Sequence, residues 1–483
     1  MITRMERQLE KQNRIIKWTL KLSIKSLVIF SIHVLSMLLI ILIDGLDYRA
    51  KISLFAFLLA MTLWITTKIP AGLVAITLIM FIILMNAGEP DLLYHSLSEE
   101  VVWLMIGSFI IGEAVKVSGL AERLTFLILR KFNKKSNMLL GLSSVLFASA
   151  FFIPSTSGRA ALSLPIMNQL SQKFSPKEQS VLAILAPVII LMSTSATLIG
   201  AGSHLIGIGL LESTVDQSIS YIQWLIWGVP FALVITFVSF LLIKWMLWPR
   251  NGLKVIESEQ TEGKIIDKKQ LNGEEKKTLI LILFLVAGWV TESIHGFDIA
   301  FTTMVGAILI MTPNYGIISW KQGMNSVSWN LIVFVAAATA LGKVLVDTGI
   351  VKWIENEILS VLHLFIGAPD WLIVLIILLV TVTSHLYITS HTTRAIVFIP
   401  GLLLFAETIG VNPATVAFIS LIGMNYCVTV PVSSKALLLF YEEGEISYEA
   451  SNLVKISAVL MPIYILVMMI FYFSYWQWTG MYL

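Results

Sequence analysis

The sequence predicts an all-α polytopic membrane protein built from two similar repeats. Hydrophobic residues make up 57% of the 483 residues and charged residues only 13%. Apolar runs of about 20 residues, the length that crosses a bilayer as a helix, recur from end to end. One short motif also occurs once in each half. Because the apolar runs are continuous and do not alternate with polar residues, helices are favoured over a membrane β-barrel.

Composition also restricts the partners and cofactors that we expect. A net charge of +3 gives no support to nucleic-acid binding. The single cysteine, Cys427, excludes an internal disulfide and disfavours a cysteine-based metal site. We therefore expect no cofactor, and a multi-pass protein surrounded by membrane lipids.

The chain divides into four parts. Residues 1–25 carry seven Lys and Arg residues against two Glu, so the positive-inside rule places the N-terminus in the cytoplasm, most simply of a bacterial cell membrane. Residues 26–248 form the first membrane repeat. A hydrophilic inter-repeat linker, 249–277, connects it to the second repeat, 278–483.

The elements of the first repeat follow from its apolar runs and their breaks. Helices are expected near 27–43, 52–67 and 72–85, followed by an acidic loop at 86–100. The run 101–117, broken at Gly119, and its amphipathic return 121–132 are short for two crossings and fit a re-entrant hairpin. A helix over 138–153 is interrupted by the first motif and resumes at 160–170, and a polar loop with Lys173, Lys177 and Glu178 follows it. A second polar interruption over 193–204 follows the run 181–192, and 222–248 is a full crossing.

The second repeat has the same plan. Apolar runs at 278–290 and 300–311 precede a second expected hairpin, 329–346 with its return over 351–365. The run 371–383 leads to the second motif and resumes at 395–405. A polar interruption over 425–435 and a last crossing, 453–478, complete the plan.

The two motifs place a buried cation and several hydroxyls at a helix break. They read Pro154-Ser155-Thr156-Ser157-Gly158-Arg159-Ala160 and Thr389-Ser390-His391-Thr392-Thr393-Arg394-Ala395. An arginine inside an apolar segment is costly and is usually functional. Broken helices near the middle of a membrane are typical of transporter binding sites.

These features resemble the divalent anion:sodium symporter family of dicarboxylate, tricarboxylate and sulfate carriers. The stretches 70–75 and 102–124 are similar to that family, and its Ser-Asn-Thr signature corresponds to Ser155-Thr156-Ser157 and to Ser390-His391-Thr392. Arg159 and Arg394 fall at the arginine position of the oxoglutarate/malate and citrate/succinate exchangers. The resemblance implies a homodimer in which a transport domain moves against a fixed scaffold, an elevator. It also implies sodium as a coupling ion, whose ligands we would place at Ser155, Gly200, Ser390 and Ser433.

The chemistry of these residues predicts a site for a small anion. Arg matches a carboxylate or sulfate through two parallel hydrogen bonds, and helix N-termini add backbone N–H donors. Our hypothesis is that the two arginines each hold one end of a dicarboxylate, or supply charge that sodium supplies elsewhere. The simpler alternative is that they pair with buried carboxylates such as Glu113 or Asp347, or cap helix carbonyls. The full candidate set is Ser155, Thr156, Ser157, Arg159, Ser390, His391, Thr392, Arg394, Ser434 and Lys435.

We therefore predict a secondary active transporter of small organic dianions such as malate, oxoglutarate, succinate or citrate, working by exchange or cation coupling. One alternative keeps the fold and changes the cargo to sulfate or another inorganic oxyanion, coupled to sodium. A membrane-embedded enzyme acting on a lipid-linked substrate is disfavoured, because the sequence has no His-Glu-x-x-His, Gly-x-Ser-x-Gly or P-loop motif.

Overall fold

The computed structural model describes residues 24–67, 69–120, 123, 135–151, 153, 155–249, 271–350, 353, 365–442 and 446–483. Over these residues the protein is helical and contains no strand. Four of the described helices are long and apolar enough to cross a membrane, and a bent pair, 320–326 with 329–345, makes a fifth crossing if it is counted as one span. The predicted fold class, all-α and polytopic, is confirmed.

The first repeat contains the expected helices and one that was not expected. A short helix, α5, lies inside the segment 86–100 that we expected to be a loop. The elements are α2 (Ile24–Ile41), α3 (Tyr48–Thr66), α4 (Ala71–Leu84), α5 (Asp91–Ser96), α6 (Glu100–Val117), α8 (Lys135–Ala148), η1 (Ser149–Phe151), α9 (Thr156–Ser171), α10 (Pro176–Ser193), η2 (Thr194–Ala196), η3 (Leu198–Gly200), α11 (Gly202–Val215) and α12 (Tyr221–Leu247).

The second repeat presents the same succession around its own motif. Its elements are α13 (Gly273–Val290), α14 (Glu292–His295), α15 (Ile299–Met311), α16 (Trp320–Ser326), α17 (Trp329–Asp347), α19 (Asp370–Thr383), η5 (Ser384–Leu386), α20 (His391–Ile409), α21 (Pro413–Asn425), η6 (Pro431–Ser433), α22 (Lys435–Glu442), α23 (Ala450–Phe471) and η7 (Tyr472–Trp476). In both halves a helix, a 3-10 turn, a motif-bearing helix and a further helix precede the second polar break.

Three expectations fall on residues that the structure does not describe. The first is the basic segment 1–25, of which residues 1–23 are not described, and the second is most of the inter-repeat linker. The third is the pair of amphipathic returns, 121–132 and 351–365, of which only residues 123, 353 and 365 are described. The end of the expected linker is already helical, because Asn272 and Glu275 form a capping box that starts α13.

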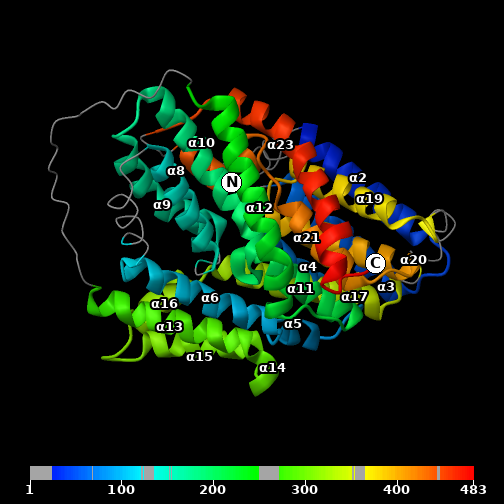
Figure 1. The fold of residues 1–483 in the computed structure, drawn as a ribbon. Helices are drawn as coiled ribbons and strands as arrows, with labels where there is room; N and C mark the ends of the chain where they lie inside the picture. The colour runs from blue at the N-terminus through cyan, green and yellow to red at the C-terminus, as the bar shows by residue number, and fades with distance from the viewer. Residues whose placement is uncertain are drawn as a thin grey trace, which may run out of the picture.

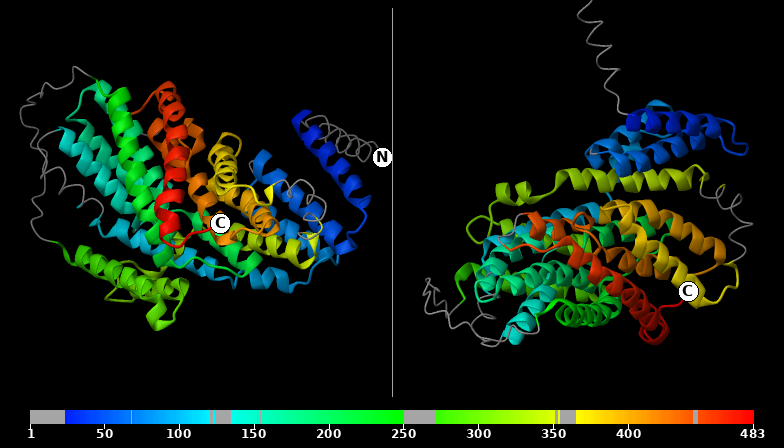
Figure 2. Two further views of the ribbon diagram at one scale, coloured as in Figure 1. Left: turned by 45° about the vertical axis from the view of Figure 1, so that its right-hand side comes forward. Right: turned by 90° about the horizontal axis from the view of Figure 1, so that it is seen from above.

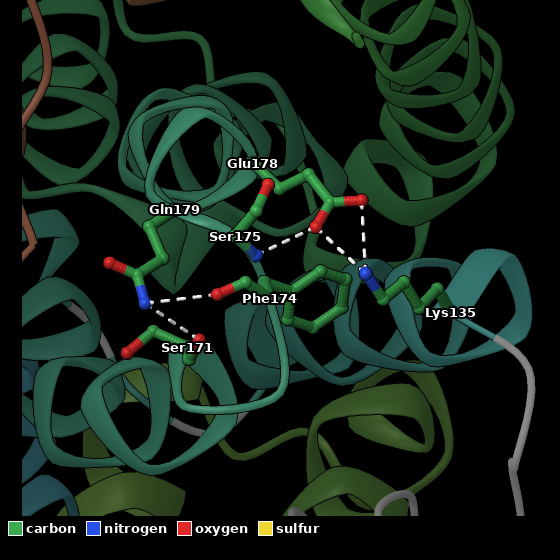
Figure 3. A network of polar contacts seen from close by, with 6 residues as sticks. All are labelled: Lys135, Ser171, Phe174, Ser175, Glu178 and Gln179. Carbon is green, nitrogen blue, oxygen red and sulfur yellow. Dashed lines mark hydrogen bonds and ion pairs between the residues drawn. The ribbon is translucent and has the colours of Figure 1, made fainter. Parts of the chain in front are cut away.

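The first motif lies at the turn of a helical hairpin, because the outer ends of its two arms meet. Lys135, the first residue of α8, donates to both carboxylate oxygens of Glu178 at 2.8 and 3.1 Å, just beyond the far end of α9 (Figure 3). Glu178 also accepts from the Ser175 amide at 2.8 Å and is fully buried. This ion pair belongs to the first turn of α10, where we expected a polar loop. Both α8 and α9 pack against α10, in the upper left part of the view (Figure 1).

Aromatic side chains pack the two repeats together near the last crossing. Trp224 and Trp227 of α12 contact Phe418 of α21, with ring centroids 5.0 and 5.2 Å apart. Trp476 donates from its indole nitrogen to the Trp227 carbonyl oxygen at 2.9 Å. Elsewhere α17 passes between the layer of α3 and α4 and the rest of the protein (Figure 2). The motif-bearing helices also pack across the repeats, because α9 contacts α22 and α20 contacts α11.

Candidate functional site

A cavity of about 530 Å³ lies between the two motifs. Both motifs contribute to its wall, although they are half a chain length apart in the sequence. Eight of the ten residues predicted for the substrate line it, and the two arginines do not. The described residues around it are Met105, Ser108, Phe109, Ser155, Thr156, Ser157, Ala201, Gly202, Ser203, Leu205, Ser328, Asn330, Leu331, Phe334, Thr389, Ser390, His391, Thr392, Thr393, Ser434 and Lys435.

The two motif serines have the same structural role, because each one caps the N-terminus of a helix. Ser155 Oγ accepts from the Gly158 amide at 3.1 Å and is the N-cap of α9. Ser390 Oγ accepts from the Thr393 amide at 3.2 Å and is the N-cap of α20. Serine is among the preferred N-cap residues because its oxygen accepts from a free amide of the first turn. Each motif therefore begins a helix at the cavity.

Four of the described helices have their first residue in the wall of this cavity. The first residues of α9, α11, α20 and α22 are Thr156, Gly202, His391 and Lys435, and all four line it. A helix N-terminus carries a partial positive charge and unsatisfied N–H groups, so it attracts anions. Lys435 adds a full positive charge, and no carboxylate occurs among the described residues of the lining. The cavity is built to attract negative charge.

Arg159 lies behind the cavity wall. Its side chain is 1% exposed. Its Nη1 donates to Ser193 Oγ at 3.0 Å, and its Nη2 donates to Thr194 Oγ1 at 2.6 Å. These hydroxyls stand at the C-terminal end of α10, where a positive charge complements the helix dipole. The partners are hydroxyls, so the alternative of a buried carboxylate partner does not describe this arginine.

Arg394 occupies the matching place in the second repeat with fewer partners. It is fully buried, and its Nη1 donates to the Tyr426 carbonyl oxygen at 3.2 Å. Tyr426 is the C-cap of α21, so this arginine also stands at a helix C-terminus. Its Nε and Nη2 have no hydrogen-bond partner. The two arginines are equivalent in position but not in hydrogen bonding.

A buried polar network joins the two repeats between the arginines. His204 Nε2 lies 3.1 Å from Asn425 Oδ1, and Asn425 Nδ2 donates to Ser195 Oγ at 3.0 Å. His204 Nδ1 lies 3.1 Å from the Thr197 carbonyl oxygen. All of these side chains are buried. The network connects the break after α10 to the end of α21.

His391 connects the cavity to the single cysteine. Its Nε2 lies 3.1 Å from Cys427 Sγ, while its buried Nδ1 has no partner. The neighbouring His385 is engaged on both nitrogens, with Val382 O and with Thr429 Oγ1, at 2.6 Å each. The imidazole that faces the cavity is therefore the one that still has a free nitrogen.

Two of the four residues proposed for a coupling cation line the cavity. Ser155 and Ser390 line the cavity as N-caps. Gly200 and Ser433 are buried and are absent from the described lining. Ser433 Oγ donates to the Val430 carbonyl oxygen at 2.6 Å and accepts from its amide, which closes its own turn. No group of three or more His, Cys, Asp or Glu in the described chain is arranged to hold a metal ion.

Sequence reasoning missed part of the lining. Ser108 of α6 and Ser203 of α11 face the cavity with buried hydroxyls that lack a partner. Ser328 and Asn330, at the start of α17, complete the wall. The sequence signal that could have identified Ser328 and Asn330 is their position at the start of an apolar run. Ser108 gave none, because small hydroxyl residues are also ordinary packing groups between membrane helices.

Charged residues of the two expected hairpins lie elsewhere. Glu113 and Lys116 form an ion pair of 3.4 Å within α6. Lys343 and Asp347 line a separate cavity of about 440 Å³. A small third cavity of about 100 Å³ is lined by Glu100, Glu212, Glu292 and Asp298. Burial, followed by the charge of Asp298, raises the pKa of Glu292, which lies in α14 between crossings.

The fold and the cavity define a helical membrane carrier with an anion-attracting site between two repeats. The model of the family described as "sodium:sulfate symporter transmembrane region" matches residues 21–482. The chain belongs to this family, which confirms the expected family of divalent anion:sodium symporters. It is an integral membrane protein and a transporter, not an enzyme.

Relatives and a solved structure agree with this assignment. A Cupriavidus necator membrane protein is 23% identical over 79% of this chain and 76% of its own. The sodium-dependent dicarboxylate transporter SdcS of Staphylococcus saprophyticus is 23% identical over 85% and 86%, and that of Staphylococcus aureus is 22% identical over 86% and 85%. The crystal structure of the Alcanivorax borkumensis YdaH transporter has a similar fold, with a TM-score of 0.56 and 12% identity over 79% of this chain and 85% of that one.

Proposed function

We propose that this protein is a secondary active transporter of small organic dianions, di- or tricarboxylates of the size of malate, oxoglutarate, succinate or citrate. The observation that carries the proposal is the convergence of four helix N-termini and Lys435 on one cavity without a described carboxylate. The substrate contacts would come from the hydroxyls and amides of Ser155–Ser157 and Ser390–Thr392, and from Ser434 and Lys435. A volume of about 530 Å³ accommodates a carboxylate skeleton.

The arginines act from behind the wall in this proposal. Each stands at a helix C-terminus, and no carboxylate is among the hydrogen-bond partners that it has in the described part of the chain. An uncompensated buried charge next to a cavity of low dielectric acts strongly on an anion inside it. The arginines would thereby supply the fixed positive charge that a coupling sodium ion supplies elsewhere in the family, and transport would be an exchange of anions.

Two findings favour a second candidate, sodium-coupled transport of a dicarboxylate or of sulfate. The description of the matching family names sodium and sulfate, and the SdcS relatives are named as sodium-dependent dicarboxylate transporters. Ser155 and Ser390 would then belong to the cation sites. In either case we propose an elevator movement in a homodimer of a bacterial cell membrane, with the N-terminus in the cytoplasm.

Uptake into proteoliposomes separates the candidates. Labelled malate, oxoglutarate, citrate and sulfate are offered with or without a sodium gradient, and with or without the same anion inside. Uptake that requires internal anion and ignores sodium supports exchange. Uptake into empty vesicles that follows the sodium gradient contradicts exchange. Uptake of sulfate alone would replace the carboxylate proposal by the inorganic one.

A further inference from the structure

The two repeats present different chemistry to the cavity. The described lining residues of the first repeat are uncharged, and they include Ser108 and Ser203, whose buried hydroxyls have no partner. The second repeat contributes the one lysine, Lys435, and His391, whose Nδ1 is unpartnered. The repeated fold therefore encloses a site whose two sides are not equivalent.

The buried arginines extend the same difference. Both Nη atoms of Arg159 are engaged by the Ser193 and Thr194 hydroxyls, at 3.0 and 2.6 Å. Arg159 leaves only Nε unpartnered, whereas Arg394 leaves both Nε and Nη2 unpartnered although its side chain is fully buried. Buried N–H donors are nearly always satisfied in folded proteins. Of these unpartnered nitrogen atoms, His391 Nδ1 belongs to a residue of the cavity lining, while those of Arg394 lie behind the wall. The side of the second repeat therefore has more unsatisfied N–H capacity than the side of the first.

Donor and acceptor chemistry then decides which group suits which side. An ionised carboxylate only accepts hydrogen bonds, so it matches Lys, Arg and an imidazole N–H. A serine hydroxyl both donates and accepts, so it matches a group that does the same, such as a carboxamide or a protonated carboxyl.

We infer that the site binds one ionised carboxylate on the side of the second repeat and an uncharged hydrogen-bonding group on the side of the first. The inference rests on the proposed function and narrows its substrate class. The site takes dianions, but it needs only one full negative charge, so half-amides of dicarboxylic acids are ligands as well. Lys435 and His391 contact the charged end, Arg394 adds its charge from behind the wall, and Ser108 and Ser203 position the uncharged end.

Competition against labelled succinate tests this in proteoliposomes of the full-length protein. The competitors are succinate, its half-amide succinamate, butyrate and succinamide. Succinamate is expected to inhibit within about fivefold of succinate. Butyrate, which has one charge and an apolar end, is expected to be at least about tenfold weaker than succinamate, because it leaves buried hydroxyls unpaired. Succinamide, without a charge, is expected not to inhibit.

Pairs of matched variants test which residues bind each end of the ligand. Lys435→Gln is expected to raise the inhibition constants of succinate and succinamate together, by about tenfold for one lost charge-assisted bond, while the exposed Lys455→Gln leaves both unchanged. Ser203→Ala is expected to weaken succinamate more than succinate. Ser420→Ala serves as its control, because Ser420 is also buried and unpartnered but lies outside the described lining.

Two results would overturn the inference, and they are distinct from failure of the proposed function. Succinate uptake that succinamate does not inhibit at hundredfold excess shows that two charges are required. The second result is an equal loss of succinate affinity in Arg159→Gln and Arg394→Gln, measured on variants that are both purified as folded protein. This result shows that the two sides are equivalent. Vesicles that take up none of the carboxylates overturn the inference and the proposed function together.

Discussion

At the scale of single residues, the two motif arginines differ in what a substitution removes. Arg159 bonds two hydroxyls through two nitrogen atoms, a geometry that one ammonium group does not reproduce. We expect Arg159→Lys to lower the free energy of unfolding by about 1.5–3 kcal/mol, the range for a lost hydrogen bond to a charged group. Arg394→Lys gives up one bond, to a carbonyl, and is expected to cost less. Thermal unfolding in detergent compares the two, and equal losses would contradict the difference in bonding.

The ion pair that closes the first hairpin gives a second prediction at this scale. Glu178→Gln leaves Lys135 without its counter-charge in a place where Glu178 is fully buried. Breaking a buried pair from one side costs about 3–5 kcal/mol. The control is Glu274→Gln, whose partner Lys277 is at 3.3 Å and whose side chain is 48% exposed. Its cost is expected to stay below about 1 kcal/mol. A shift in melting temperature no larger than that of the control would show that the hairpin does not depend on Glu178.

The sequence indicated which residues lie near the cavity more reliably than it indicated which side chains reach into the cavity. Ser155, Ser390 and Lys435, which we predicted to contact a substrate, line the cavity. Arg159 and Arg394 stand four residues after the N-caps, a full turn deeper in their helices, and lie in the wall. The motif shows the order of residues, but whether a guanidinium lies in the cavity or behind it depends on the hydroxyls and carbonyls of other helices.

At the scale of elements, the polar break after α10 depends on a glycine. A Cβ at Gly200 would overlap the Thr194 carbonyl oxygen and crowd Thr197 Oγ1. We expect Gly200→Ala to shift the η2–η3 turn, which holds the Thr194 partner of Arg159, and to destabilise the protein by about 1–3 kcal/mol, the usual cost of overpacking. Substrate uptake should fall with it.

Gly401 is the matched control for this prediction. It lies within α20, is exposed, and has open space at the position of a Cβ. Gly401→Ala is expected to stabilise its helix by about 0.5–1 kcal/mol. Unfolding and uptake are measured on both variants. If Gly200→Ala behaved like Gly401→Ala, the break would be more adaptable than its contacts indicate.

Hydropathy predicted where helices lie, and we interpreted each motif as the break in one discontinuous helix. An apolar run, a polar break and a second run fit a broken crossing and a hairpin equally well. The contact that places the motif at a hairpin turn joins Lys135 to Glu178, and Glu178 was expected in a polar loop. A long-range ion pair has no local signature, so the sequence alone did not distinguish the two arrangements.

At the scale of the whole molecule, the repeats are joined where their broken segments meet. Asn425 of α21 contacts His204 of α11 and Ser195 of η2. Asn425→Ala leaves a buried imidazole and a buried hydroxyl without this partner, which is expected to cost about 1–3 kcal/mol. Because both arginine sites border this network, through Thr194 on one side and Tyr426 on the other, the loss should also weaken substrate affinity.

A double-mutant cycle tests whether the network joins the repeats energetically. His204→Ala and Asn425→Ala remove the same contact, so their combined effect on unfolding should be smaller than the sum by about 0.5–3 kcal/mol. The control pairs His204→Ala with Asn412→Ala. Asn412 caps the opposite end of α21 and accepts from the Ala414 amide at 2.9 Å. The helix of 13 residues separates it from Asn425 by about 20 Å, so these two effects should add. Additivity in both cycles would mean that the repeats are held by their aromatic packing, and that the two halves of the site respond independently to substrate.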